Sequence, residues 1–365
     1  MHLISPSKVI RGHKAWASAI DDILKISQKP LILGRSNSTK KIRTQIQDDL
    51  KNKHLNVVNA NLQYDCCRED IDRLLKIATN NKCDCIIATG GGKVLDAGKL
   101  LAEYISIPCI TVPLSASTCA GWTALANIYT TKGQFIEDIS LKSCPKLLIY
   151  DSSFLATAPP KTMTSGIADS LAKWYESSLT SNSSKDGIVQ QAIQISRVLR
   201  DQLFIHGQDA YKNYKESNQS WLNVIEGNGL TAGLIGGIGG EKCRTAAAHA
   251  IHNAITQLEP KKNPLHGEIV GVGILIQLRL EEMVNNNQLA SQAIRQLFPF
   301  MKSLNLPTTI YELGIDVFEK DNLNKIAEFT CREESEIHFL PFKVEANDIV
   351  RVISVFERQK IPNSN

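Results

Sequence analysis

The sequence predicts an α/β N-terminal domain built on a parallel sheet, followed by an all-α C-terminal domain. Three observations support this fold class. Short apolar runs alternate with amphipathic segments over about the first 150 residues, which is typical of a parallel sheet covered by helices on both faces. Farther along, long segments with helical spacing dominate and strand patterns nearly disappear. The length of 365 residues exceeds the roughly 250–300 at which single cores stop growing, which favours two domains.

The expected elements of the N-terminal domain are short apolar strands and one clear amphipathic helix. The segment at 30–33 is expected to be a strand that ends at Gly34-Arg35-Ser36. Segment 70–78 has apolar side chains at helical spacing. The remaining strands are expected at residues 56–58, 85–88 and 109–112.

The Pro159-Pro160 pair marks the expected domain boundary, because two prolines stop any preceding element. The N-terminal domain then covers residues 1–159, and the helical domain covers residues 160–365. Helices of the second domain are expected at residues 164–179, 187–201, 245–258, 268–283 and 287–303.

The composition argues against several classes of protein. The 41 basic and 37 acidic residues give a net charge of +4 with no dense basic block, so neither nucleic acid nor an anionic membrane is an expected partner. The N-terminus has no apolar signal region, and no segment reaches the roughly 18 apolar residues that span a bilayer. The nine cysteines lack the spacing of structural zinc sites, and their odd number leaves one unpaired. We therefore expect a cytoplasmic protein with reduced thiols.

The first candidate site is the glycine loop Thr89-Gly90-Gly91-Gly92-Lys93, between a strand and a helical segment. Glycines let the backbone approach a phosphate closely, and a helix N-terminus offers free N–H groups. Asp96 and Lys99, three residues apart beside the loop, strengthen the prediction of a Rossmann-like dinucleotide-binding domain. The alternative is a tight strand-to-helix turn. A second glycine cluster at 236–240 follows no strand and indicates a flexible connection or close helix packing, with phosphate binding as the lesser alternative.

The second candidate site combines Asp169, His249 and His266, which are far apart in the sequence. Asp169 lies in an apolar helical segment, and a buried carboxylate needs a partner such as a metal ion. His252 follows His249 by three residues, so both can lie near one helix face. One carboxylate and two imidazoles can hold zinc or iron and leave a position open for an alcohol or carbonyl oxygen. The alternative is a buried structural His252, a loop histidine at 266 and an ion-paired Asp169.

Taken in order, these motifs resemble the glycerol dehydrogenase branch of the iron-containing (group III) alcohol dehydrogenase family, which shares its architecture with dehydroquinate synthase. The resemblance runs from about Ile86 to Leu278. It implies a metal-binding helical domain, with the metal on Asp169, His249 and His266. The stretches that carry it are 90–99, 116–118, 128–130, 166–176, 248–253 and 266–268. It implies NAD(P) phosphates on Gly90, Gly91, Gly92 and Lys93, and further cofactor contacts from Thr111, Leu114, Thr123, Leu125 and Tyr129.

Three departures from the family pattern refine this interpretation. Lys173 stands four residues after Asp169, where the broader iron-dependent members carry a fourth ligand, a histidine. This departure favours a three-ligand centre and zinc over iron. At the end of the first strand, NAD-dependent relatives carry an aspartate that holds the adenosine ribose, whereas this chain has Arg35 and Ser36. An arginine with hydroxyls suits a 2′-phosphate, so we expect NADP(H) to be favoured over NAD(H).

The third departure concerns the substrate. Glycerol dehydrogenases resemble Ser-Thr-Asp-Ala where this chain reads Ser117-Thr118-Cys119-Ala120, and Trp122 follows closely. Loss of a hydrogen bond to a charged group costs on the order of 1.5–3 kcal/mol, which disfavours glycerol. The stretch instead resembles hydroxycarboxylate dehydrogenases, which reduce 2-oxo acids, and the missing carboxylate removes repulsion against an acid.

The sequence thus predicts a metal-dependent, NAD(P)-linked oxidoreductase that interconverts a small alcohol, a 2-hydroxy acid or polyol, and its carbonyl compound by hydride transfer. His252 is expected either to relay a proton or to act behind the metal ligands. The alternatives are an NAD-linked glycerol dehydrogenase proper, a sugar-phosphate lyase or glycerol-1-phosphate dehydrogenase of the same fold, and a metal- or nucleotide-binding protein without turnover. We expect a small-molecule substrate and a homo-oligomer.

Overall fold

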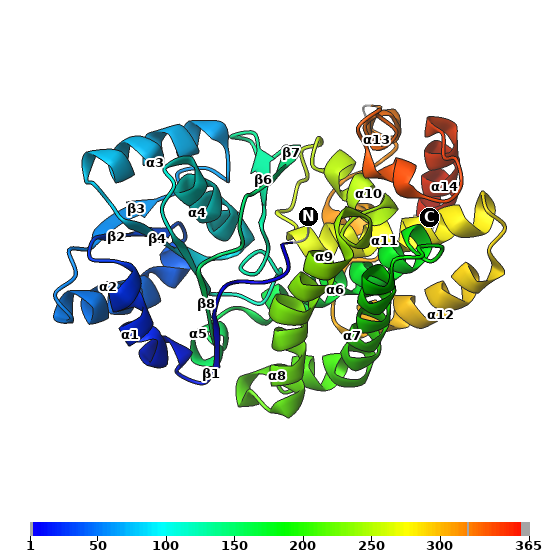
Figure 1. The fold of residues 1–365 in the computed structure, drawn as a ribbon. Helices are drawn as coiled ribbons and strands as arrows, with labels where there is room; N and C mark the ends of the chain where they lie inside the picture. Colours follow the sequence, from blue (N-terminus) through cyan, green and yellow to red (C-terminus); the bar gives the residue numbers. More distant parts are fainter. Residues whose placement is uncertain (1–2, 320, 359–365) are drawn as a thin grey trace. The chain divides into compact units, whose positions relative to one another are not determined.

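The computed structural model describes residues 3–319 and 321–358, which fold into two compact units (Figure 1). The first unit contains Met1–Pro159 and Gly229–Gly237, and the second contains Pro160–Asn228 and Ile238–Asn365. The first unit therefore includes a segment that the sequence analysis assigned to the second domain. Within the described ranges, no helix combines the length and the apolar character needed to cross a membrane.

The first unit contains a six-stranded sheet in the order β1-β8-β5-β4-β2-β3, and every neighbouring pair of strands is parallel. This arrangement confirms the predicted parallel sheet. A separate antiparallel hairpin consists of β6 (Leu125–Tyr129) and β7 (Phe135–Ser140). The strands of the large sheet are β1 (Val9–Gly12), β2 (Pro30–Gly34), β3 (Val58–Asn61), β4 (Cys85–Gly90), β5 (Cys109–Pro113) and β8 (Leu147–Asp151).

Helices cover both faces of this sheet, and each strand contributes alternate side chains to the two faces (Figure 1). Ile32 and Ile87 pack with α1 and α2, whereas Leu31, Leu33 and Ile86 pack with α3 and α4. Because both faces are buried, the central strands are apolar at nearly every position, which explains the continuous runs in the sequence. The helices of this unit are α1 (Ala15–Ile26), α2 (Lys40–Asn52), α3 (Arg68–Asn80), α4 (Gly92–Tyr104) and α5 (Ser152–Leu155).

Some of the elements predicted for the first unit are present in the structure, one is shifted, and several observed strands were not predicted. The strands expected at 30–33, 85–88 and 109–112 correspond to β2, β4 and β5, whereas β3 begins at Val58, where the predicted strand ends. The sequence analysis missed β1, β8 and the β6–β7 hairpin. At the second glycine cluster, most of the residues belong to α9 (Ala232–Gly239), and a Cβ on Gly237 would come within 2.3 Å of the Ile4 carbonyl oxygen. Close helix packing is therefore the alternative that fits this cluster.

The second unit is helical, and all five helices that the sequence analysis expected are present. Its centre is α11, which contacts α6, α10, α12 and α14. The helices that correspond to predictions are α6 (Pro160–Thr180), α7 (Gly187–Lys212), α10 (Ala247–Ile255), α11 (His266–Met283) and α12 (Gln288–Ser303). Those not anticipated are α8 (Gln219–Glu226), α13 (Asn322–Thr330) and α14 (Ala346–Arg358).

Two glycines of α11 allow its neighbours to pack unusually close. A Cβ on Gly267 would lie 1.9 Å from the Ser165 carbonyl oxygen of α6, and one on Gly273 would lie 2.4 Å from the Ala248 carbonyl oxygen of α10. A side chain at either position would force the helices apart. The Gly267 N–H also donates to Ser165 Oγ at 3.1 Å. These contacts fix α6 and α10 against α11, and all three helices carry a predicted metal ligand.

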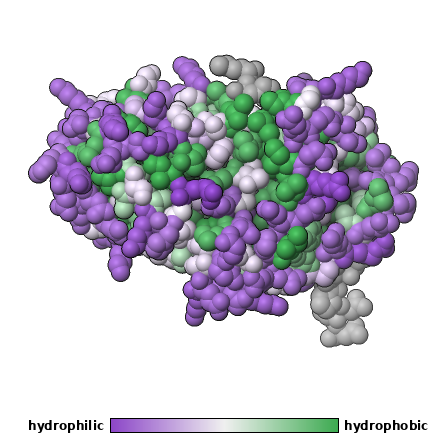
Figure 2. All heavy atoms as spheres, turned by 60° about the horizontal axis from the view of Figure 1, so that its bottom comes forward, coloured by the Kyte–Doolittle hydropathy of each residue, from purple (hydrophilic) through white to green (hydrophobic). Residues whose placement is uncertain are grey.

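The face of the molecule drawn in Figure 2 carries hydrophilic side chains interspersed with smaller apolar areas. This mixture agrees with a chain in which 21% of residues are charged and the two signs nearly balance.

The cysteines expected in strands are buried, and burial raises the pKa of the Cys109 thiol in β5 to about 12. Such a thiol behaves as a small apolar side chain.

Candidate metal centre and glycine loop

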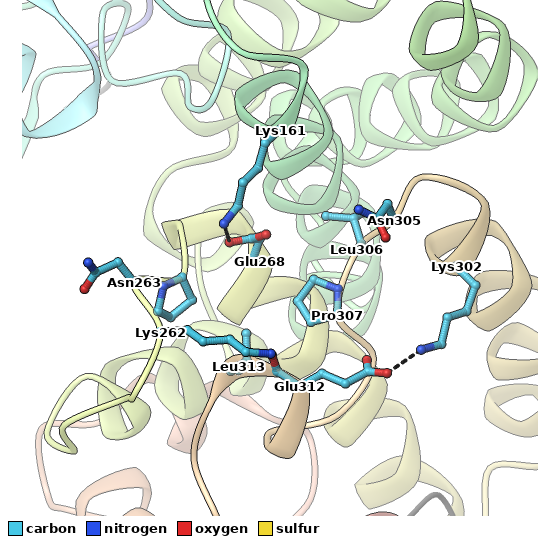
Figure 3. A pocket seen from close by; sticks show the side chains of 11 residues that line it. Lys161, Lys262, Asn263, Glu268, Lys302, Asn305, Leu306, Pro307, Glu312 and Leu313 are labelled. Carbon is cyan, nitrogen blue, oxygen red and sulfur yellow. Dashed lines mark hydrogen bonds and ion pairs between the residues drawn. The ribbon is translucent and has the colours of Figure 1, made fainter. Parts of the chain in front are cut away.

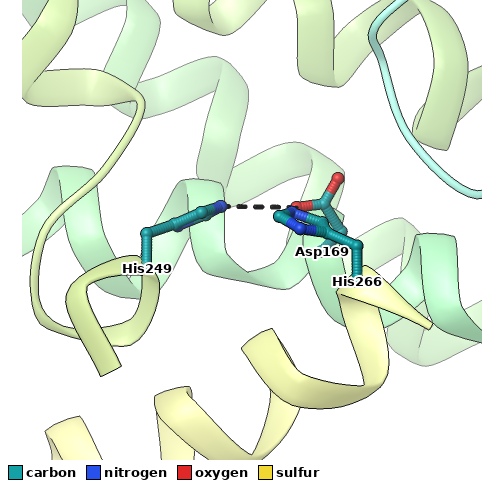
Figure 4. Close-up of side chains that lie close together, drawn as sticks. All are labelled: Asp169, His249 and His266. Atoms are coloured by element: carbon teal, nitrogen blue, oxygen red, sulfur yellow. Dashed lines mark ion pairs between the residues drawn. The ribbon is translucent and has the colours of Figure 1, made fainter. Parts of the chain in front are cut away.

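The structure brings the three predicted metal ligands together within the helical unit (Figure 4). Asp169 lies midway along α6, His249 lies in the first turn of α10, and His266 is the first residue of α11. Asp169 Oδ1 is 3.5 Å from His249 Nε2 and 3.4 Å from His266 Nε2. Figure 4 shows the three side chains pointing toward one another from their separate helices.

This cluster fits a divalent metal ion. Asp169 Oδ1 is buried, and within the described ranges it has no hydrogen-bond partner. Zinc binds histidine nitrogens and carboxylate oxygens at about 2.0–2.2 Å, so ligand atoms around one tetrahedral ion lie about 3.3 Å apart. The observed separations of 3.4 and 3.5 Å match that spacing. Although burial opposes its ionisation, the two histidines hold the pKa of Asp169 well below 3.8, as a metal ligand requires.

Glu176, two turns after Asp169 on α6, holds His249 in position. Its Oε2 lies 2.7 Å from His249 Nδ1, and its Oε1 accepts the backbone N–H groups of Ala246 and His249. A carboxylate can only accept, so Nδ1 carries a proton and Nε2 is the nitrogen that faces Asp169. Burial opposes the charged form of His249, but Glu176 and Asp169 raise its pKa to about 9. Glu176 thus occupies Nδ1 and leaves Nε2 as the nitrogen that a metal ion can bind in exchange for its proton.

His252 has a corresponding position behind His266. Its Nε2 lies 2.9 Å from His266 Nδ1, and its Nδ1 lies 2.9 Å from Asn253 Oδ1. If Nδ1 of His252 donates to the Asn253 carbonyl oxygen, Nε2 accepts from His266 and leaves His266 Nε2 free as a ligand. Burial and the neighbouring His266 lower the pKa of His252 well below 6.5, which favours this neutral form. The geometry therefore favours the second role expected for His252, orienting a ligand.

Lys173, at the position of the family's fourth ligand, is buried on the same helix. Its Nζ donates to the Arg244 carbonyl oxygen at 3.1 Å. An ammonium group has no lone pair for a metal, so this side chain adds a positive charge beside the cluster and no ligand.

A separate pocket of about 450 Å³ opens in the helical unit near the start of α11 (Figure 3). Its two ion pairs are Lys161 with Glu268 at 3.0 Å and Lys302 with Glu312 at 2.5 Å. The first pair joins the initial turns of α6 and α11 and so helps to align the helices of the metal cluster. None of the three predicted ligands lines this pocket.

The glycine loop lies where the sequence predicted, between β4 and α4 in the first unit. Gly91 is the N-cap residue of α4, and Lys93 is in its first turn. In the sheet, β4 lies between β2 and β5, so the carboxyl ends of these three strands share one edge. Arg35 and Ser36 follow β2 directly, and Leu114, which follows β5, donates its N–H to the Gly90 carbonyl oxygen at 2.9 Å. The edge has the arrangement that binds nucleotides in open α/β sheets.

Arg35 and Lys93 meet at a residue that the sequence analysis did not select, Asp65. The guanidinium of Arg35 pairs with one carboxylate oxygen, and the ammonium group of Lys93 pairs with the other. Lys93 Nζ also lies 4.9 Å from the centre of the Tyr129 ring. The structure thus joins two of the predicted cofactor residues through one unanticipated carboxylate and places a third, Tyr129, beside Lys93.

Other predicted cofactor residues have structural contacts of their own. Lys99 Nζ lies 3.0 Å from Asp96 Oδ1 and donates to the backbone carbonyl groups of Thr123 and Leu125, which fastens α4 to the start of β6. The fully buried Thr111 hydroxyl donates to the Gly121 carbonyl oxygen at 2.7 Å. Their cofactor roles stay predictions.

The two predicted substrate residues, Cys119 and Trp122, lie in the segment between β5 and β6. The Trp122 N–H donates to the Cys119 carbonyl oxygen at 2.9 Å. The Trp122 indole N–H donates to the Ile4 carbonyl oxygen at 2.9 Å, and its ring packs against Gly233 of α9. Within the first unit, Trp122 therefore holds Ile4 and Gly233 against the segment between β5 and β6.

Sequence reasoning missed Glu176 and Asp65, although each had a detectable signal. Glu176 is seven residues, or two helical turns, after Asp169, so it lies on the same helix face. Asp65 follows the third strand of a parallel sheet, at the edge where the glycine loop was expected. In both cases the partner comes from a distant part of the sequence, so spacing alone did not reveal the pairing.

Comparisons with known proteins agree with the fold. Residues 6–152 match the family model described as iron-containing alcohol dehydrogenase. The chain is 43% identical over 341 residues to an uncharacterized oxidoreductase of Synechocystis sp., covering 93% of this chain and 88% of that protein. It is 31% identical over 280 residues to hydroxycarboxylate dehydrogenase A of Escherichia coli, covering 76% and 75%. Its structure is similar to that of glycerol dehydrogenase from Schizosaccharomyces pombe, with a TM-score of 0.86 and 28% identity over 98% of this chain and 90% of that one.

Proposed function

Because the chain belongs to the iron-containing alcohol dehydrogenase family and is thus an oxidoreductase of alcohols and carbonyl compounds, we propose that it interconverts a small 2-hydroxy acid and its 2-oxo acid. The single observation that best supports the chemistry is the convergence of His249 Nε2 and His266 Nε2 on Oδ1 of Asp169, a buried atom without a hydrogen-bond partner in the described part of the chain. Donors of this kind bind a divalent ion.

The proposed metal site uses Asp169, His249 and His266. A divalent ion held there supplies a Lewis acid, which stabilises negative charge on the reacting alcohol or carbonyl oxygen. Glu176 and His252 keep the two imidazoles in the ligand tautomers and orientations. We propose zinc over iron, because Lys173 offers no fourth ligand and its ammonium group is bound to a backbone carbonyl.

The nicotinamide dinucleotide, which supplies or accepts the hydride, is assigned to the glycine loop. The backbone N–H groups at the start of α4 favour a pyrophosphate, and Gly91 leaves space for its approach. Arg35 and Ser36 favour a 2′-phosphate, and so does Arg43, whose guanidinium donates, among the described residues, only to neutral acceptors on Ser36, Thr39 and Asn61. We therefore propose NADP(H) over NAD(H). A higher kcat/KM with NADH than with NADPH would contradict this preference.

The choice of a 2-oxo acid over dihydroxyacetone rests on Cys119. An uncharged thiol at this position neither binds a polyol hydroxyl as a carboxylate does nor repels the carboxylate of an acid substrate. Trp122 supports the proposal less directly, because its indole N–H is already bound to the Ile4 carbonyl oxygen.

A substrate panel tests the proposal. The metal-loaded protein is mixed with NADPH and, separately, with 2-oxo acids, aldehydes, dihydroxyacetone and dihydroxyacetone phosphate, and the loss of NADPH absorbance is measured. The highest kcat/KM for a 2-oxo acid supports the proposal. The highest value for dihydroxyacetone supports glycerol dehydrogenase proper, the second candidate, which the similarity to the Schizosaccharomyces pombe structure favours. Turnover of the phosphate ester alone would contradict both.

A further inference from the structure

One buried carboxylate links the two cations that we assign to different phosphates of the cofactor. Asp65 pairs through one oxygen with Arg35, at the end of β2, and through the other with Lys93, at the start of α4. Its side chain is 9% exposed, whereas those of Arg35 and Lys93 are 40% and 42% exposed. A ligand can therefore reach both cations while the carboxylate stays behind them.

The loop that carries Asp65 is held on several sides. Asp70 Oδ2 accepts the backbone N–H groups of Gln63 and Tyr64 at 2.7 and 2.8 Å. The carbonyl oxygen of Cys66 accepts the Tyr129 N–H at 2.9 Å, which ties the loop to the β6–β7 hairpin. A Cβ on Gly133 would lie 3.2 Å from Asp65 Oδ2, so the hairpin turn also closes on the carboxylate. Asp65 is thus a fixed negative charge that cannot easily move away from an incoming anion.

A fixed carboxylate at this point acts differently on the two cofactors. NADP(H) and NAD(H) differ only at the adenosine 2′ position, where one carries a phosphate of nearly two negative charges and the other a neutral hydroxyl. Arg35 attracts the phosphate, but Asp65 repels it and competes for the same guanidinium. A ribose hydroxyl meets no such repulsion, and a carboxylate is the group that binds it in many dinucleotide sites.

We propose that Asp65 is a specificity-determining residue that opposes the 2′-phosphate of the cofactor. The inference rests on the proposed nucleotide site and deepens it. NAD-dependent relatives carry an aspartate at the end of β2, and this chain has none there. Asp65, in the loop after the neighbouring strand β3, brings a carboxylate to the same edge of the sheet. Cofactor preference is then the difference between attraction by Arg35 and Arg43 and repulsion by Asp65. Removing the carboxylate shifts that balance toward NADP(H).

The test compares two nucleotides that differ only by the 2′-phosphate, adenosine 2′,5′-bisphosphate and adenosine 5′-monophosphate. Calorimetry measures their Kd values with the full chain and with Asp65→Asn, which keeps the shape of the side chain and removes its charge. We expect the ratio of affinities to shift toward the bisphosphate by about tenfold or more. Asp72→Asn is the matched control, because it removes the same charge from an exposed position on α3 and should leave the ratio unchanged.

Each possible result of this comparison either supports the role of Asp65 or overturns it. An unchanged ratio, or an equal loss of affinity for both nucleotides, would overturn the inference and leave Asp65 as a structural link. A wild-type protein that binds neither nucleotide would instead refute the proposed nucleotide site, and the inference with it. If Asp65→Asn does not fold, Arg35→Gln supplies the test, because loss of this exposed guanidinium should shift the ratio the opposite way. An unchanged ratio in that variant would overturn the inference.

Discussion

The metal cluster and the nucleotide cluster of this protein hold their charged side chains in opposite ways. In the metal cluster, the side chains of Asp169 and His249 are 5% and 9% exposed, that of His266 is 24% exposed, and Glu176 and His252 behind the ligands are buried. In the nucleotide cluster, Arg35 and Lys93 remain 40% and 42% exposed and share one carboxylate. In the first arrangement, buried hydrogen-bond partners fix the orientation of the ligands. The second leaves cations that can exchange a protein partner for a phosphate.

This difference follows from what each ligand requires. A metal ion needs deprotonated ligands at fixed distances, so a buried hydrogen-bond partner behind each imidazole contributes directly to affinity. A dinucleotide binds and leaves in each catalytic cycle, and exposed ion pairs are worth little and exchange readily. Substitutions in the metal cluster should therefore have larger effects than substitutions at the nucleotide edge.

The largest expected effect is that of His266→Ala. This change removes one of three ligands, so metal content and turnover should be lost together. Elemental analysis of the purified variant and the NADPH assay measure the two quantities. His13→Ala, which removes an exposed histidine, is the control and should retain both. Turnover by metal-free His266→Ala protein would disprove the proposed role of the metal.

Glu176→Gln should have the next largest effect, through the tautomer of His249. The glutamine oxygen can still accept the N–H groups of Ala246 and His249, but its NH₂ group then faces His249 Nδ1. Nδ1 must become an acceptor, which moves the proton to Nε2 and blocks the ligand lone pair. We expect metal affinity to fall about 10- to 100-fold. A competition titration with a chelator measures this, and Glu333→Gln, at an exposed glutamate, is the control. Unchanged affinity would mean that Glu176 only caps α10.

Sequence patterns predicted the sheet type, the five helices and the three ligand candidates, because each depends on local spacing or on a buried polar residue in an apolar helix. They did not predict the residues behind the ligands. Glu176 has a clear function only once α10 lies against α6, and that approach depends on Gly267 and Gly273 of α11. Asp65 likewise acts on partners from two other strand ends. Edge strand β1, with four residues and partial burial, lacked any strong periodic signal.

The smallest expected effect concerns the glycine loop. Alanine substitutions at its two neighbouring glycines, Gly90 and Gly91, should distinguish an effect on folding from an effect on nucleotide binding. A Cβ on Gly90 would lie 2.8 Å from Val94 Cβ, so Gly90→Ala should destabilise the first unit by about 1–3 kcal/mol. A Cβ on Gly91 would meet Ser115 Oγ at 3.4 Å, an ordinary contact, and the Gly91 φ of −84° suits alanine.

Gly91→Ala should therefore fold normally but weaken nucleotide binding by about tenfold, or about 1.4 kcal/mol, because its methyl group stands at the N-terminus of α4 where a phosphate would approach. Thermal unfolding and calorimetric Kd values for NADP⁺ separate the two effects, and metal affinity should not change in either variant. Wild-type nucleotide affinity in Gly91→Ala would favour the alternative of a tight turn. In that case the glycine loop would not contribute to nucleotide binding. The evidence for a nucleotide site at this edge of the sheet would then rest on the charged side chains of Arg35, Asp65 and Lys93.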